Sequence, residues 1–301
     1  MGTGLAPRDQ GTPRHPAGES WKWHSAEEGA ALARRLKLPR VAWLAEATST
    51  MDVAEQLARE GAVGGTLVLA DAQTAGRGRN GRAWTSPPGT GLWMTLIERP
   101  LDATGLDVLS LRVGLRVAAS LDRFAGGRIS IKWPNDLLLP GGKLGGILVE
   151  ARWREHRPEW VAIGIGINLL VRPVAGSTAL GDRGDRGSSS AASLPSADAT
   201  SSDAVAPDAR SGATARFEAF REAVLQDLVP AVRSAAAADG PLSAGELEAF
   251  AVRDWARGRR VTSPYAGTVA GVSATGAVLI ETSGGMVACR SGSLVLEGGG
   301  A

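Results

Sequence analysis

The 301-residue chain contains a single cysteine, Cys289, and only three histidines. One cysteine excludes an intramolecular disulfide framework and a zinc site built from several thiolates. Cys289 stands between apolar residues of a predicted strand, so we interpret it as a packing residue. The histidines lie in charged or proline-rich surroundings, where we expect neither a catalytic triad nor a metal site. We therefore assign no metal ligand from the sequence.

Long apolar runs and a strong charge surplus are also missing. No apolar stretch approaches the roughly 20 residues that a membrane-spanning helix needs, and residues 1–20 lack the apolar segment of a secretory signal. We therefore expect a cytoplasmic protein. The 33 basic and 31 acidic residues leave a net charge of only +2, which argues against nucleic-acid binding through bulk charge. Any site for an anion must be local.

What the chain does contain is an alternation of helical and extended patterns. Helices are predicted at 25–38, from Ser49 or Thr50 to Gly61, and at 106–127, with strands at 40–47, 65–73 and 91–100 and three or four more within 128–171. Short turns join the last strands, as in an antiparallel or mixed sheet. This order predicts an α+β domain with helices packed on a mixed sheet. From Gly258 onward, short β-rich pieces separated by glycine predict a small β-barrel.

Two stretches are predicted to be disordered. Residues 1–20 are rich in glycine, proline and charge, and residues 173–213 consist mainly of serine, alanine, aspartate and glycine. Neither stretch has enough large apolar side chains to bury. We therefore expect a disordered extension at 1–20, a main domain at 21–257 with a disordered insertion at 173–213, and a barrel at 258–301.

The segment QTAGRGRNGRAWTSPPGTGLWMT, residues 73–95, places three arginines among five glycines. Glycine leaves the backbone free and costs entropy to order, so we expect a mobile loop that closes over an anion. A solvated basic loop has the same composition, and so has an arginine–glycine strand that touches RNA. The other motifs have to discriminate among these alternatives.

Two further segments hold polar side chains in restrained positions. Lys132 ends a strand just before a Pro-Asn-Asp turn, whose geometry would point its ammonium toward developing negative charge. The alternative is an ordinary strand-end lysine in solvent. In GIGINL, residues 164–169, the glycines let a planar ligand or a backbone approach the strand, although a bulge would use them equally well. Asn168 adds an amide that both donates and accepts. No Walker or dinucleotide-binding motif is present.

Three segments in this order resemble the biotin–protein ligases: GRGRNGRAWTSPPGTGLWMTL, KWPNDLLLPGGKLGGILVE and GIGINL. The resemblance runs from about Ala42 to Leu296, interrupted by the predicted insertion. It implies a class II synthetase-like catalytic domain followed by an SH3-like barrel. It also implies a biotin–[acetyl-CoA-carboxylase] ligase that uses ATP and Mg²⁺ to make biotinyl-5′-adenylate. The biotinyl group then passes to a lysine of an apo biotin carboxyl carrier domain of a biotin-dependent carboxylase.

The resemblance assigns roles to individual residues. It makes Lys132 the catalytic residue that bridges the biotin carboxylate and the α-phosphate, and Arg79 the catalytic residue that holds the intermediate. It places the biotin and ATP contacts at Ser49, Thr50, Met51, Gln73, Gly76, Arg77, Gly78, Arg79, Arg82, Trp84, Lys132, Lys143, Gly146 and Asn168. Among these, Gln73 would bind the ureido side of biotin, and Asn168 would contact adenine.

Other positions depart from the family pattern or have a less defined role. Family members usually carry asparagine or a similar polar residue where this chain has Met51, so we expect a contact only from its backbone. Gly146 is expected against the biotin ring, and Arg82 and Trp84 on the adenylate side. Lys143 is expected to face phosphate, and Asp136 to hold metal or Lys143.

Two alternatives and one architectural expectation complete the interpretation. A lipoate–protein ligase uses the same adenylate chemistry but lacks the arginine–glycine loop and the Lys-Trp-Pro-Asn-Asp turn. A nucleic-acid-binding module would need repeated arginine–glycine units, interleaved aromatics and a basic surplus. Only about 40 residues precede the catalytic region, too few for the winged helix of longer family members, so we expect a monofunctional ligase. We expect no nucleic-acid or membrane partner, and leave open whether the chain forms a homodimer.

Overall fold

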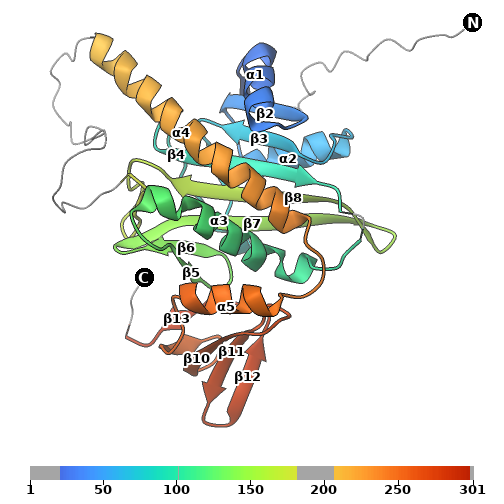
Figure 1. The fold of residues 1–301 in the computed structure, drawn as a ribbon, viewed down its shortest axis with the longest axis vertical. Coiled ribbons are helices and arrows are strands. Elements are labelled where there is room, and N and C mark those ends of the chain that lie inside the picture. Colours follow the sequence, from blue (N-terminus) through green and yellow to red (C-terminus); the bar gives the residue numbers. More distant parts are fainter. Residues whose placement is uncertain (1–20, 101, 182–206, 299–301) are drawn as a thin grey trace, which may run out of the picture.

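The computed structural model describes residues 21–100, 102–181 and 207–298 (Figure 1). The extension predicted at 1–20 lies outside these described residues. An eight-stranded mixed sheet has the order β1-β2-β3-β4-β8-β7-β6-β5, in which β2 and β3 run parallel and the other neighbours antiparallel. Its strands are β1 (Lys22–Trp23), β2 (Arg40–Glu46), β3 (Thr66–Ala70), β4 (Gly91–Glu98), β5 (Ser130–Lys132), β6 (Asp136–Leu139), β7 (Gly142–Arg154) and β8 (Arg157–Asn168).

Five α-helices and two short 3₁₀ turns accompany the sheet in the described chain. They are α1 (Ala26–Leu36), α2 (Thr50–Arg59), α3 (Leu109–Ala125), α4 (Pro207–Ala236) and α5 (Ala244–Arg253), with η1 (Arg79–Gly81) and η2 (Leu106–Val108). The sequence signals at the helix starts are confirmed. Ser25 and Glu28 form the predicted capping box of α1, and Ser49 caps α2 by accepting a hydrogen bond from the backbone N–H of Met51.

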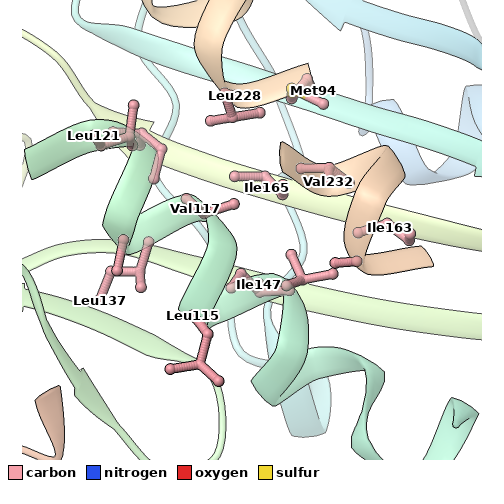
Figure 2. Packing of buried hydrophobic residues seen from close by; sticks show 14 of the residues in the cluster. Met94, Leu115, Val117, Leu121, Leu137, Ile147, Ile163, Ile165, Leu228 and Val232 are labelled. Carbon is pink, nitrogen blue, oxygen red and sulfur yellow. The ribbon is translucent and has the colours of Figure 1, made fainter. Parts of the chain in front are cut away.

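Helices cover both faces of the sheet, because alternate strand residues are apolar on both sides. Leu67 and Leu69 of β3 belong to the larger core with α1, α3 and α4, whereas Val68 and Ala70 belong to a second core with α2. Figure 2 shows the larger core, where Val117 and Leu121 of α3 and Leu228 and Val232 of α4 lie over Met94, Ile147, Ile163 and Ile165 of the strands.

The C-terminal part forms a five-stranded antiparallel sheet of order β12-β11-β10-β9-β13. Its strands are β9 (Arg260–Ser263), β10 (Gly267–Val272), β11 (Val278–Thr282), β12 (Gly285–Cys289) and β13 (Val295–Leu296). Cys289 ends a strand and packs against the core, as predicted. Figure 1 shows this red sheet below α5. The Trp133 indole N–H donates to the Gly276 carbonyl at 3.0 Å and so joins this sheet to the main domain.

The insertion predicted at 173–213 is too wide at both ends. Residues 177–180 are buried, and the backbone around them pairs with β7: Lys143 N–H donates to the Gly176 carbonyl, and Thr178 N–H donates to the Lys143 carbonyl. At the other end, α4 already begins at Pro207. The remainder, 182–206, lies outside the described residues.

Candidate active site

A cavity of about 380 Å³ opens between the main sheet and the C-terminal sheet. Its walls come from the start of α2, the loop after β3, the β5–β6 turn, and the glycine-rich parts of β7 and β8. The structure brings together all the predicted biotin and ATP contacts except Gly76 and Asn168. Those that line the cavity are Ser49, Thr50, Met51, Gln73, Arg77, Gly78, Arg79, Arg82, Trp84, Lys132, Lys143 and Gly146.

One rim of the cavity is polar and internally hydrogen-bonded. The Gln73 side-chain oxygen accepts from the backbone N–H of Thr50 at 2.8 Å and from its hydroxyl at 3.2 Å. The Gln73 amide donates to the Ser86 hydroxyl at 2.7 Å, and the buried Thr95 hydroxyl donates to that of Thr50 at 2.9 Å. These bonds fix the end of β3 against the start of α2, so Gln73 presents a fixed amide at the cavity wall.

The opposite wall is apolar because glycines on two paired strands admit large side chains. Gly146 of β7 faces Gly166 of β8, and the indole of Trp84 lies over both of them. A Cβ at Gly166 would come within 2.6 Å of Trp84 Nε1, and one at Gly146 within 3.5 Å of the ring. Likewise, a Cβ at Gly164 would meet the Met51 sulfur at 2.7 Å. The predicted close approach to the GIGINL strand is therefore made by side chains of the protein itself.

Positive charge dominates the cavity. Its described lining holds the cations Arg77, Arg79, Arg82, Lys132 and Lys143 but the single carboxylate of Asp136. Asp136 is already paired, because its Oδ1 lies 2.7 Å from Lys143 Nζ. The Arg79 guanidinium donates to the Asn135 side-chain oxygen at 3.4 Å, which ties the arginine–glycine loop to the Pro-Asn-Asp turn. Arg77 is paired as well, with Asp52 and Glu150 at 3.2 Å each. Arg79, Arg82 and Lys132 are thus the lining cations that form no ion pair with a described carboxylate.

Burial and mutual repulsion destabilise the charged forms of two of these side chains. Burial lowers the pKa of Lys132, and the positive charges of Lys143 and Arg82 lower it further, while Asp136 acts in the opposite direction. Burial likewise lowers the pKa of Arg79, with Arg82 adding to the effect against the pull of Asp136. Cations that crowd together and lose water in this way gain most when an anion enters.

Two predicted contacts lie elsewhere. Gly76 is a packing position, since a Cβ there would come within 2.4 Å of the Trp84 carbonyl oxygen. Asn168 is buried at the end of β8, where its amide donates to the Thr178 carbonyl at 2.9 Å and the Lys143 carbonyl at 3.3 Å. In this structure Asn168 therefore joins the 177–180 segment to the strand that carries Lys143.

Sequence reasoning missed part of the lining. Trp133, Pro134 and Asn135 lie in a motif that the sequence singled out, so their place in the wall follows once Lys132 is in the site. The C-terminal residues Ser293, Leu294, Val295 and Leu296 also line the cavity. Their sequence carries no signal beyond a short β-rich pattern, because the contact is made only when the two sheets come together.

Comparison with known proteins finds a family model that matches the segment forming most of the cavity. Residues 43–168, from β2 to the end of β8, match the model of the Biotin/lipoate A/B protein ligase family. This matched segment contains the arginine–glycine loop, the Lys132 turn and the glycine-rich strands.

Relatives of similar sequence carry ligase names. The Bifunctional ligase/repressor BirA of Bacillus subtilis (strain 168) is 46% identical over 127 residues, which make up 42% of this chain and 39% of that protein. The Biotin--[acetyl-CoA-carboxylase] ligase of Paracoccus denitrificans is 43% identical over 137 residues, 44% of this chain and 56% of that protein. The match therefore spans less than two thirds of the length of either relative.

Solved structures establish the fold. The biotin protein ligase from Aquifex aeolicus in complex with biotin and ATP superposes with a TM-score of 0.61 at 24% identity, covering 85% of this chain and 98% of that one. This likeness, together with the mixed sheet and the C-terminal five-stranded sheet, confirms the predicted α+β fold with its SH3-like barrel. No described helix has the length and apolar character that crossing a membrane requires.

Proposed function

We propose that this chain is a biotin–protein ligase. It activates biotin with ATP as biotinyl-5′-adenylate and transfers the biotinyl group to a lysine of a biotin carboxyl carrier domain. The observation that carries the proposal is the cavity of five cations and one carboxylate, formed mostly by the segment that matches the ligase family model. The Biotin--[acetyl-CoA-carboxylase] ligase of Paracoccus denitrificans supports biotin over lipoate as the acid.

The first step joins two anions, which is why the site must be cationic. A carboxylate oxygen of biotin attacks the α-phosphorus of ATP, and the bond to the β-phosphate breaks to release pyrophosphate. Lys132, at the end of β5, is placed to bind the carboxylate and the α-phosphate together and to stabilise the charge that develops between them. Lys143 and Arg82 add positive charge from the neighbouring wall.

Mg²⁺ enters this proposal as a companion of the ATP phosphates. The described residues contain no group of three or more His, Cys, Asp or Glu side chains placed to hold a metal ion. Asp136 is the one carboxylate among the described lining residues. Such a site fits Mg²⁺, which is commonly held by one or two carboxylates plus substrate phosphates and water. Asp136 would be the protein ligand, and the ion would neutralise phosphate charge.

The second step requires that water stay away from a mixed anhydride. The amine of the acceptor lysine attacks the activated carbonyl, the bond to the phosphate oxygen breaks, and AMP leaves as the amine loses a proton. Until then the adenylate must be covered. The loop from Gly76 to Arg82 supplies the cover in this proposal, with Arg79 anchored to Asn135 of the Lys132 turn. The proposal also keeps the expected location in the cytoplasm.

The test is direct. Purified protein is mixed with biotin, MgATP and an apo carrier domain, and the mass of the carrier is measured. We expect a mass increase of one biotinyl group, which is lost with Lys132→Ala. The control Lys22→Ala should keep it, because Lys22 is an exposed residue of β1 whose ammonium pairs with Glu46. Transfer of octanoate or lipoate but not biotin would instead favour the lipoate ligase alternative.

A further inference from the structure

A tryptophan outside the matched family segment lies against Lys132. Trp255 belongs to the short connection between α5 and β9, and its ring centroid is 4.9 Å from Lys132 Nζ. A second cation, the Arg259 guanidinium, lies 4.3 Å from the same centroid. The face of an indole attracts cations more strongly than other aromatic side chains do. The proposed catalytic lysine therefore shares an aromatic surface with an arginine at the entrance to the C-terminal barrel.

The position of Trp255 is fixed by its backbone. Its N–H donates to the carbonyl of Ile131 at 3.0 Å, and Asp254 pairs in parallel with Ile131. The connection thus adds a short piece of chain to the edge strand β5, directly beside Lys132. Two residues before Trp255, the Arg253 guanidinium donates to the Asp122 carboxylate at 2.7 and 3.1 Å and to the Ile129 carbonyl at 2.9 Å. These bonds hold the ring at a defined place relative to the lysine.

Lys132 needs such a partner. Its ammonium forms neither an ion pair nor a hydrogen bond with any described residue. Asp136 attracts it from beyond ion-pair distance, and the nearby cations Lys143 and Arg82 repel it. A lysine side chain has four flexible bonds, and restricting them costs conformational entropy. An aromatic face restrains the ammonium without neutralising it, whereas a carboxylate would compete with the substrate anions for its charge.

We infer that Trp255 is a positioning residue for Lys132, holding the ammonium on its indole face where the biotin carboxylate and the α-phosphate meet. This inference rests on the proposed ligase function. Trp255 itself does not line the cavity. The barrel also holds the residue after Lys132, because Trp133 donates its indole N–H to the Gly276 carbonyl.

The experiment measures single-turnover formation of biotinyl-adenylate. For Trp255→Leu we expect the rate at saturating substrates to fall about 3- to 30-fold, the range that corresponds to one desolvated cation–π contact. Trp255→Phe, which keeps an aromatic face, should recover part of the loss. Trp153→Leu, at an exposed hairpin position, is the matched tryptophan control and should leave the rate within about twofold. Thermal unfolding of each variant identifies any general loss of structure.

Two further variants separate positioning from packing. In a Lys132→Ala background, Trp255→Leu should slow the reaction little more, because the indole would act through an ammonium that is absent. Arg259→Ala should leave the rate within about twofold, since it removes the other cation but not the ring. Equal effects of Trp255→Leu with and without Lys132, or no rescue by phenylalanine at unchanged stability, would overturn the inference. An inactive wild type would instead refute the proposed function itself.

Discussion

Alanine substitutions at the facing glycines Gly146 and Gly166 test how the cavity wall is built. Both positions lie under the indole of Trp84, but only one has room for a methyl group. At Gly166 the added Cβ would come within 2.6 Å of Nε1 and 2.7 Å of Cε2 of that ring. At Gly146 the nearest ring atom would be 3.5 Å away, which is an ordinary contact.

These distances set the expected magnitudes. A methyl group forced into a packed site typically costs about 1–3 kcal/mol, and the indole of Trp84 can escape only by giving up its contacts with the glycine wall and its edge contact with Trp93. We therefore expect Gly166→Ala to lower the free energy of unfolding by about 1–3 kcal/mol. Gly146→Ala should stay within about 1 kcal/mol of wild type, because alanine also restricts the unfolded chain.

Urea denaturation of the two variants provides the measurement, and a double-mutant cycle with Trp84→Ala identifies the cause. Without the indole, Gly166→Ala should become nearly neutral, so its coupling with Trp84 should equal most of its cost. If Gly166→Ala is as stable as wild type while Gly146→Ala is not, the indole does not lie on β8 as described.

Three other predictions concern buried or half-buried polar groups. Arg112 is buried and bound to Glu246 and to the carbonyls of Ala238, Gly240 and Pro241. Arg112→Ala should lower stability by about 2–5 kcal/mol in urea denaturation, because it leaves a cavity and removes these hydrogen bonds. Asn168→Ala should lower stability by about 1–3 kcal/mol by the same assay, whereas a residue used only for adenine would change ATP affinity alone. The pKa of Asp71 is held low by hydrogen bonds from Arg221, Trp43 and His24 that outweigh its burial. A lowered carboxyl pKa stabilises the fold above the unfolded value, and this stabilisation is lost as pH falls through the folded one. The stability difference between wild type and Asp71→Asn should therefore shrink below about pH 4, and a difference that grows in acid would contradict this assignment.

Features that depend on a single helix start or a single turn could be predicted from the sequence. The capping box at Ser25 and the cap at Ser49 each involve residues within three positions of one another, so the chain itself records them. The arginine–glycine loop and the Lys132 turn are similarly compact. For this reason twelve of the fourteen contacts predicted from the sequence line the cavity.

The failures have a shared physical origin in contacts between distant segments. Residues 177–180 look like linker, yet their backbone pairs with β7 and with Asn168 across the sheet, and this pairing satisfies polar groups that composition alone would leave in water. No sequence pattern predicts the contact between Trp255 and Lys132 either. Its role depends on a hydrogen bond to Ile131, more than a hundred positions earlier in the chain.

In the proposed function, the placement of the cations explains how a nearly neutral chain binds a triphosphate. A uniformly basic surface would attract any polyanion and would be screened by salt within about 10 Å. Here the described lining of one cavity carries five cations against a single carboxylate, and two of those cations, Lys132 and Arg79, have lost part of their water. A ligand that satisfies them must therefore place its negative charge inside the cavity, where the acid and the phosphate have to meet. In the proposed reaction, this arrangement of charge stabilises the geometry in which the acid and the phosphate react. It does more than attract any anion to the protein surface.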